Sequence, residues 1–129
     1  MEDKTLYLSG RIGNGGKCSP EEQLQAIRNG EELYGALMAK GYSVFCPHLS
    51  YYPDKRWREE GVTKYMFDHE HWLSVDKQWV HKCKYFFYMD PKIYGESKGA
   101  KMELTWAKDW SKRIFYNIDE VPSKLEITL

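Results

Sequence analysis

The apolar run from Tyr85 to Met89 constrains the fold of this chain more than any other segment. It ends at Asp90-Pro91 and shows no alternation of polar and apolar residues, so both of its faces are apolar. A strand of this kind is typical of the middle of a parallel sheet, where helices cover both sides. The chain is therefore expected to be an α/β protein.

Strand-like and helix-like segments alternate along the rest of the sequence. Short apolar runs predict strands at 5–9, 42–46, 85–89 and 113–116, with 125–128 as a candidate fifth strand. Apolar residues at helical spacing predict helices over 20–40, 65–82 and 99–111, whereas 49–62 reads as a long loop. This order favours an open, doubly wound, mainly parallel sheet of four to five strands with helices on both faces, formed by one domain over residues 1–129.

The first predicted helix has a clear start. Ser19 is a candidate N-cap, Pro20 suits the first helical position, and Glu22 lies at capping-box spacing. Gly30 and Gly35 weaken the helical pattern, so we expect a kink or close packing near them.

Charge and composition narrow the range of partners. The numbers of basic and acidic residues are equal, which gives a formal net charge of zero and a pI near 6.9. This balance gives no reason to expect a nucleic-acid polymer or an anionic membrane as partner. The N-terminal residues do not resemble a signal peptide or a spanning helix, and three widely spaced cysteines do not suggest disulfides or a zinc site. We therefore expect a cytoplasmic protein with reduced thiols.

The segment from Tyr94 to Leu104 carries the strongest functional signal. Its small residues Ser97, Gly99 and Ala100 stand at the predicted start of a helix, where free backbone N–H groups suit an anion such as a phosphate. Glu103 follows one turn inside that helix. The combination suggests a phosphorylated ligand beside a carboxylate that reacts with it.

Ligands bind such sheets beyond the carboxyl ends of the strands, near the point where the strand order reverses. If the first and third strands are neighbours, we expect the Tyr7 hydroxyl to reach the Glu103 carboxylate and to stabilise its ionised form. A rigid, ionised carboxylate can attack the anomeric carbon of a sugar. Asp76, on the preceding predicted helix, would supply a second carboxyl group for the leaving group.

Each of these residues also has an ordinary interpretation. Glu103 and Asp76 could be solvated helix residues, and Tyr7 could be a core aromatic. The cluster His69-Glu70-His71 suggests a metal at first sight, but residues two apart do not share a helical face. We expect neither a metal nor another cofactor.

Taken together, these positions resemble the nucleoside 2-deoxyribosyltransferase-like superfamily, which includes nucleoside 5′-monophosphate N-glycosidases and many small uncharacterised bacterial and phage proteins. The matching pieces occur in the family order over nearly all of the chain: Tyr7-Leu8-Ser9-Gly10, Asn29, Leu37, Gly41, Val44 to Pro47, Asp76, Cys83, Ser97 to Glu103, and Ala107. The resemblance implies a flavodoxin-like Rossmann fold. It also implies that Glu103 attacks C1′, that Tyr7 orients Glu103, and that Asp76 contacts the base or assists proton transfer to it.

The resemblance further implies a set of substrate-binding residues. They follow the first and third predicted strands: Ser9, Gly10, Arg11, Ser97, Gly99 and Ala100. Arg11 and the N–H groups of Gly99 and Ala100 would contact a 5′-phosphate. Ser97 stands where the transferases commonly have an Asp and resembles the monophosphate hydrolases, which favours a nucleotide over a nucleoside.

Three functions remain open at this point. Hydrolysis of a nucleoside 5′-monophosphate is favoured because of Ser97, base exchange by a deoxyribosyltransferase shares the same first step, and a non-catalytic nucleotide-binding or sensing protein is the third. Four aromatic residues are candidates for stacking on the base or for a subunit interface: Tyr51, Tyr52, Trp57 and Trp72. Because relatives generally form dimers or larger assemblies, a homo-oligomer is expected.

Overall fold

The structure, a computed structural model, describes residues 1–12 and 18–124. Its centre is one sheet of four parallel strands in the order β2-β1-β3-β4. The strands are β1 (Thr5–Ser9), β2 (Ser43–Phe45), β3 (Tyr85–Tyr88) and β4 (Arg113–Phe115). This is the strand order of a flavodoxin-like Rossmann fold, so the predicted fold class is confirmed. The candidate fifth strand at 125–128 lies outside the described residues.

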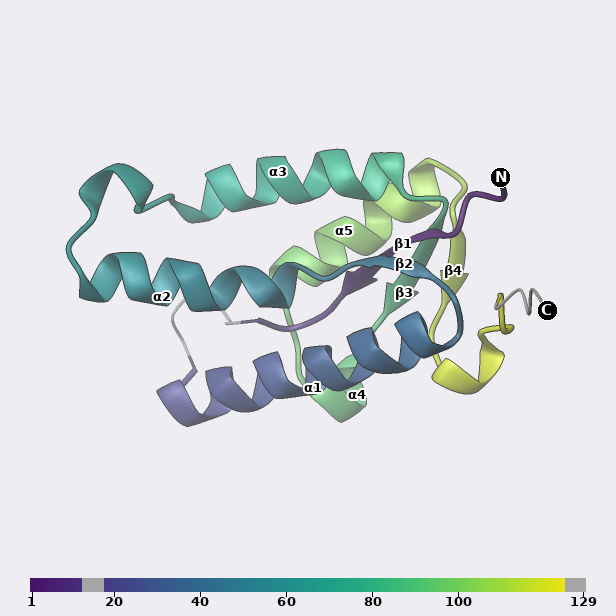
Figure 1. Cartoon of the computed structure of the whole chain (residues 1–129), viewed down its shortest axis with the longest axis horizontal. Coiled ribbons are helices and arrows are strands. Elements are labelled where there is room, and N and C mark those ends of the chain that lie inside the picture. The colour runs from purple at the N-terminus through teal and green to yellow at the C-terminus, as the bar shows by residue number, and fades with distance from the viewer. Residues whose placement is uncertain (13–17, 125–129) are drawn as a thin grey trace.

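Helices cover both faces of the sheet (Figure 1). They are α1 (Pro20–Ala39), α2 (Tyr51–Glu59), α3 (His69–Lys82), α4 (Pro91–Tyr94) and α5 (Lys98–Asp109), with 3₁₀ turns at Pro47–Ser50, Thr63–Tyr65 and Ile118–Glu120. In Figure 1, α1 lies on one side of the sheet, and α3 and α5 lie side by side on the other. Within residues 1–12 and 18–124, no helix is both long and apolar enough to cross a membrane.

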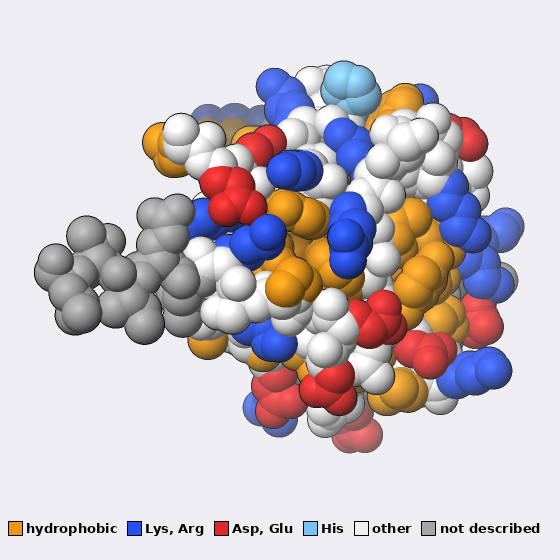
Figure 2. Space-filling view, turned by 90° about the vertical axis from the view of Figure 1, so that its right-hand side faces the viewer, with side chains coloured by type: hydrophobic (Ala, Val, Ile, Leu, Met, Phe, Trp, Pro, Cys, Tyr) orange, Lys and Arg blue, Asp and Glu red, His pale blue; other side chains and the backbone are white. Residues whose placement is uncertain are grey.

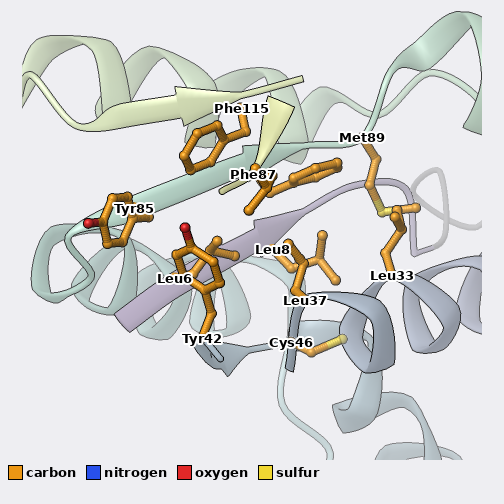
Figure 3. Packing of buried hydrophobic residues seen from close by; sticks show 11 residues of the cluster. Leu6, Leu8, Leu33, Leu37, Tyr42, Cys46, Tyr85, Phe87, Met89 and Phe115 are labelled. Carbon is orange, nitrogen blue, oxygen red and sulfur yellow. The ribbon is translucent and has the colours of Figure 1, made fainter. Parts of the chain in front are cut away.

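The two faces of β1 contact different parts of the molecule. Leu6 and Leu8 point into the core beneath α1, where they meet Phe87 of β3 (Figure 3). The alternate residues, Tyr7 and Ser9, point to the opposite face, which α3 and α5 cover. Alternation along a single strand therefore builds an apolar core on one side and presents two hydroxyl groups on the other.

Helix α1 begins as its sequence predicts. The Ser19 hydroxyl accepts a hydrogen bond from the Glu22 backbone N–H at 3.1 Å, and the Glu22 carboxylate accepts one from the Ser19 N–H at 3.4 Å. Gly30 marks close packing: a Cβ atom at this position would lie 2.4 Å from Cδ2 of His48, a fully buried residue. The helix is continuous from Pro20 to Ala39, so close packing, and not a break, explains this glycine.

The prediction that 49–62 forms a loop is wrong, because α2 occupies most of that segment. This helix buries no residue, so the sequence lacks the apolar stripe that usually predicts a helix. Ion pairs at i,i+4 spacing support it, with Arg58 Nε 3.1 Å from an Asp54 carboxylate oxygen and Lys55 Nζ 3.6 Å from one of Glu59.

Helix α3 also begins later than predicted, at His69 and not at Tyr65. Asp68 is its N-cap, and the side chain accepts a hydrogen bond from the His71 N–H at 2.8 Å. This cap fixes the direction in which the helix leads Asp76 toward the sheet.

Figure 2 shows the end of the molecule from which β1 starts, opposite the carboxyl ends of the strands. Side chains of both signs lie there beside apolar patches. The described residues on this face do not form a continuous surface of one sign, in keeping with the net charge of zero.

Candidate active site

A cavity of about 520 Å³ opens beyond the carboxyl ends of β1 and β3. The strand order reverses between these two strands, which is where ligands bind open α/β sheets. Its walls come from five regions: Gly10 and Ile12 after β1, Gln23 of α1, parts of the segment from Pro47 to Arg58, the segment from Phe67 to Asp76, and the start of α5 with the residue before it. This volume lies in the range that is typical of small-molecule sites.

The Glu103 carboxylate lies at the wall of this cavity and is held at both oxygens. The Tyr7 hydroxyl donates to Oε2 at 2.8 Å, and the Ser9 hydroxyl donates to Oε1 at 2.7 Å. Only 5% of Glu103 is exposed. The predicted contact between Tyr7 and Glu103 is confirmed, and its condition is met because β1 and β3 are paired neighbours.

The hydroxyl of Ser9, a predicted substrate-binding residue, donates to the Glu103 carboxylate. The sequence contains a signal for this contact, since Ser9 stands two residues after Tyr7 in a strand and so shares its face. The two donors come from one strand in the interior of the sheet, which fixes their spacing.

Small residues on α5 allow Glu103 to approach the sheet. Ala100, Glu103 and Ala107 are the buried residues of this helix and lie on one face at spacings of three and four. The alanines pack in the cluster that contains Tyr7. A larger residue at either position would push the helix, and with it the carboxylate, away from β1.

Asp76 supplies the second carboxyl group at the cavity. It is buried on α3, with 9% exposed, and lines the same cavity as Glu103. Burial is the main cause that raises the pKa of both carboxyl groups above their usual values, and the Asp76 charge raises the pKa of Glu103 further. The hydrogen bonds from Ser9 and Tyr7 act in the opposite direction. Two such groups share one proton over an intermediate range of pH.

Tyr7 remains a hydrogen-bond donor in this environment. Burial, together with the neighbouring charges of Glu103 and Asp76, raises the pKa of the Tyr7 phenol well above its ordinary value. The phenol therefore stays protonated and continues to donate to the carboxylate.

The start of α5 offers hydrogen-bond donors to the cavity. Ser97 is the N-cap: its hydroxyl accepts from the Ala100 N–H at 3.1 Å, and its carbonyl accepts from the Lys101 N–H at 3.1 Å. The Ala100 N–H, expected to contact a phosphate, is thus already engaged. Among the described residues, the N–H groups of Lys98 and Gly99 have no acceptor, and the Ser97 hydroxyl can still donate its hydrogen.

Arg11 is held by another group. Its Nη2 atom lies 3.2 Å from Oε2 of Glu22, at the start of α1. The guanidinium packs on Gly95, where an added Cβ would lie 2.6 Å from Nη1 and where φ is +98°. Within the described part of the chain, Gly10 lines the cavity but Arg11 does not. The segment 13–16, which belongs to the same predicted loop, lies outside the described residues.

The candidate aromatic residues separate into two pairs. Tyr51 and Trp72 line the cavity, so the structure brings them to the candidate site. Tyr52 donates a hydrogen bond to Glu31 of α1, and Trp57, which does not line the cavity, packs against Tyr65 and Phe67. Only the first pair can face a ligand here.

The histidines near the start of α3 have separate environments. The His71 ring stacks on Phe67 with 4.5 Å between ring centroids, and His69 lines the cavity. In the part of the chain that the structure describes, no three His, Cys, Asp or Glu side chains are grouped to hold a metal ion.

Comparisons with known proteins do not identify a family. No protein-family model matches the chain, and neither a curated protein nor a solved structure matches it. The functional argument therefore depends on the site itself.

Proposed function

We propose that this protein is an N-glycosidase that cleaves the bond between base and sugar in a nucleoside 5′-monophosphate. The observation that supports this most is the Glu103 carboxylate, which lies at the wall of a small-molecule cavity with one hydroxyl donor on each oxygen. A buried carboxylate that is fixed in this way has the features of a nucleophile at an anomeric carbon.

In the proposed first step, a Glu103 oxygen forms a bond to C1′ while the bond from C1′ to the base nitrogen breaks. The leaving base takes the bonding electrons and receives the proton of Asp76. Burial raises the pKa of Asp76, which favours its protonated form. Burial and the Asp76 charge raise the pKa of Glu103 as well, so the reactive form is the arrangement of the shared proton in which Asp76 is protonated and Glu103, with the hydroxyl donors Tyr7 and Ser9, is ionised.

In the second step, water attacks C1′, and the bond from C1′ to Glu103 breaks. One proton of the water passes to Asp76, which restores the starting state. The products are the free base and the sugar phosphate, and no oxidant or reductant is needed. The Tyr7 and Ser9 hydroxyls hold the Glu103 carboxylate in both steps.

The start of α5 is proposed to bind the 5′-phosphate. Gly99 and Glu103 lie four residues apart on one helix face, about 6 Å along the axis. This spacing is comparable to that between C1′ and the phosphate of a nucleotide. The free N–H groups of Lys98 and Gly99 and the Ser97 hydroxyl would donate to the phosphate, and the helix dipole would favour its charge.

The test is to incubate the protein with ribo- and deoxyribonucleoside 5′-monophosphates and to measure free base by chromatography. We expect release of base by the unaltered protein and its loss in Glu103→Gln, with nucleotide binding retained. Glu96→Gln is the matched control, because Glu96 is an exposed carboxylate beside the same helix and pairs with Lys101 at 2.7 Å. It should keep full activity.

Two results would change the proposal. If a second free base is added and appears in a new nucleotide, the enzyme is a transferase with the same first step. If the unaltered protein binds a nucleotide tightly but releases no base from any of them, the protein is a nucleotide-binding protein without turnover.

A further inference from the structure

The residues of the outer wall of the cavity have no role in the proposed reaction. Tyr51, Phe67 and Trp72 line it with aromatic rings, and Asp54 and Arg58 line it with opposite charges. These residues come from α2, the segment before α3, and the first turn of α3. Aromatic walls with a few fixed polar groups are characteristic of a site for a planar ligand.

Arg58 is fixed in place by two contacts. Its Nε donates to Oδ2 of Asp54 at 3.1 Å, and its Nη2 donates to the backbone carbonyl of Phe67 at 2.7 Å. The first contact positions the Asp54 carboxylate. The contact with Phe67 connects α2 to the segment that leads into α3, so it holds the two parts of the wall together.

Asp54 keeps an unused acceptor at this wall. Its Oδ1 atom is buried and has no hydrogen-bond partner among the described residues. A buried carboxylate oxygen without a donor is energetically unfavourable. Asp54 lines the cavity, and the terminal torsion of Asp is broad, so rotation about this torsion can turn the oxygen toward a donor on a ligand.

We propose that this wall is the base subsite, and that Asp54 selects bases with an exocyclic amino group over their oxo counterparts. This inference rests on the proposed function only for placing a nucleotide in the cavity. An amino group presents N–H donors to the carboxylate. In the oxo bases, a carbonyl oxygen occupies the same position, and its partial negative charge is repelled by Asp54.

The test uses pairs of nucleotides that differ at this group and at the hydrogen of the adjacent ring nitrogen: cytidine against uridine 5′-monophosphate, and adenosine against inosine 5′-monophosphate. We expect kcat/KM for the amino member of each pair to exceed that of the oxo member by about tenfold or more, as the loss of one charge-assisted hydrogen bond predicts. In Asp54→Asn the ratio should fall to about threefold or less, because a neutral amide can turn either its oxygen or its NH₂ group to the base.

Glu59→Gln is the matched control. Glu59 lies on the same helix and pairs with Lys55 at 3.6 Å, and it is not among the described residues that line the cavity. The variant loses the same charge as Asp54→Asn, so it should keep the ratio of the unaltered protein.

The outcomes separate this inference from the proposed function. Turnover with equal rates for both members of each pair, or an unchanged ratio in Asp54→Asn, would overturn the base subsite and leave the glycosidase in place. Calorimetric titration of the same nucleotides into Glu103→Gln gives a readout without turnover. If the amino nucleotides bind more tightly there while the unaltered protein releases no base, the subsite stands and the glycosidase is rejected. If no nucleotide binds, both proposals fail.

Discussion

Replacing Ser9 by alanine would remove one of the two hydroxyl donors from the Glu103 carboxylate. The lost hydrogen bond is short, at 2.7 Å, is buried, and is made to a charged group when Glu103 is ionised. Hydrogen bonds of this kind contribute about 1.5–3 kcal/mol, and 1.36 kcal/mol corresponds to one pKa unit. The pKa of Glu103 should therefore rise by about one to two units in the variant, because the removed bond is one that lowers it.

The expected effect on catalysis follows from the proton that Glu103 and Asp76 share. The reactive form has Glu103 ionised and Asp76 protonated, and Ser9→Ala shifts this balance toward the reverse arrangement. The reactive fraction, and with it kcat/KM at neutral pH, should fall by about 10- to 100-fold.

Two measurements check this prediction. Carbon-13 NMR of protein labelled at the Glu side-chain carboxyl would follow the titration of Glu103, assigned by the signal that Glu103→Gln lacks, and the pH profile of kcat/KM would follow catalysis. Ser74→Ala, at an exposed position of α3, is the control and should change neither. A Glu103 titration that does not move in Ser9→Ala would refute the reasoning, even if activity falls for another reason.

Four other substitutions test the site and the packing of α1. Asp76→Asn should lower kcat strongly, and the alkaline limb of the pH profile should disappear because the group that donates the proton is gone, whereas the acidic limb from Glu103 should remain. Glu103→Gln should unfold in urea with a free energy about 2–4 kcal/mol higher than the unaltered protein at pH 9, with the two closer at pH 5. The sign follows from the raised pKa of Glu103: its stabilising contribution is complete below its unfolded pKa and is lost as the pH rises through its folded pKa. Gly30→Ala should lower the free energy of unfolding by about 1–3 kcal/mol, because the added Cβ would clash with His48. Gly35→Ala on the same helix should raise the free energy of unfolding by about 0.5–1 kcal/mol, because an added Cβ there meets nothing within 4 Å. Urea titration of both variants measures these changes.

The features that could be predicted from the sequence depend on local pattern. The cap at Ser19 and the doubly apolar strand that begins at Tyr85 are encoded by neighbouring residues, and both are found where expected. The contact between Tyr7 and Glu103 could be predicted because the carboxyl ends of parallel strands meet at one edge of the sheet. Strand alternation places Ser9 on the same face as Tyr7, so the contact between Ser9 and Glu103 also has a local signal in the sequence.

The remaining features depend on tertiary packing that has no local signal. Helix α2 is stabilised by ion pairs at i,i+4 spacing and not by an apolar stripe, so hydrophobic periodicity cannot detect it. The direction of Arg11 depends on Glu22 and on the space that Gly95 leaves, and these residues are far apart in the sequence. The Asp54 oxygen without a hydrogen-bond partner can be recognised only in the folded structure, where Asp54 forms part of the cavity wall.

The two hydroxyl donors to Glu103 lie on β1, and this location limits how the part of the site around Glu103 can change. This strand lies between β2 and β3, so releasing Tyr7 or Ser9 requires opening the sheet from within, which demands a free energy close to that of global unfolding. The wall from α2 to the start of α3 lies outside the sheet and can be altered without disturbing those strands. Segments of other length and composition could therefore be grafted between β2 and α3 to give new ligand preferences, while the carboxylate and its two hydroxyl donors stay in place.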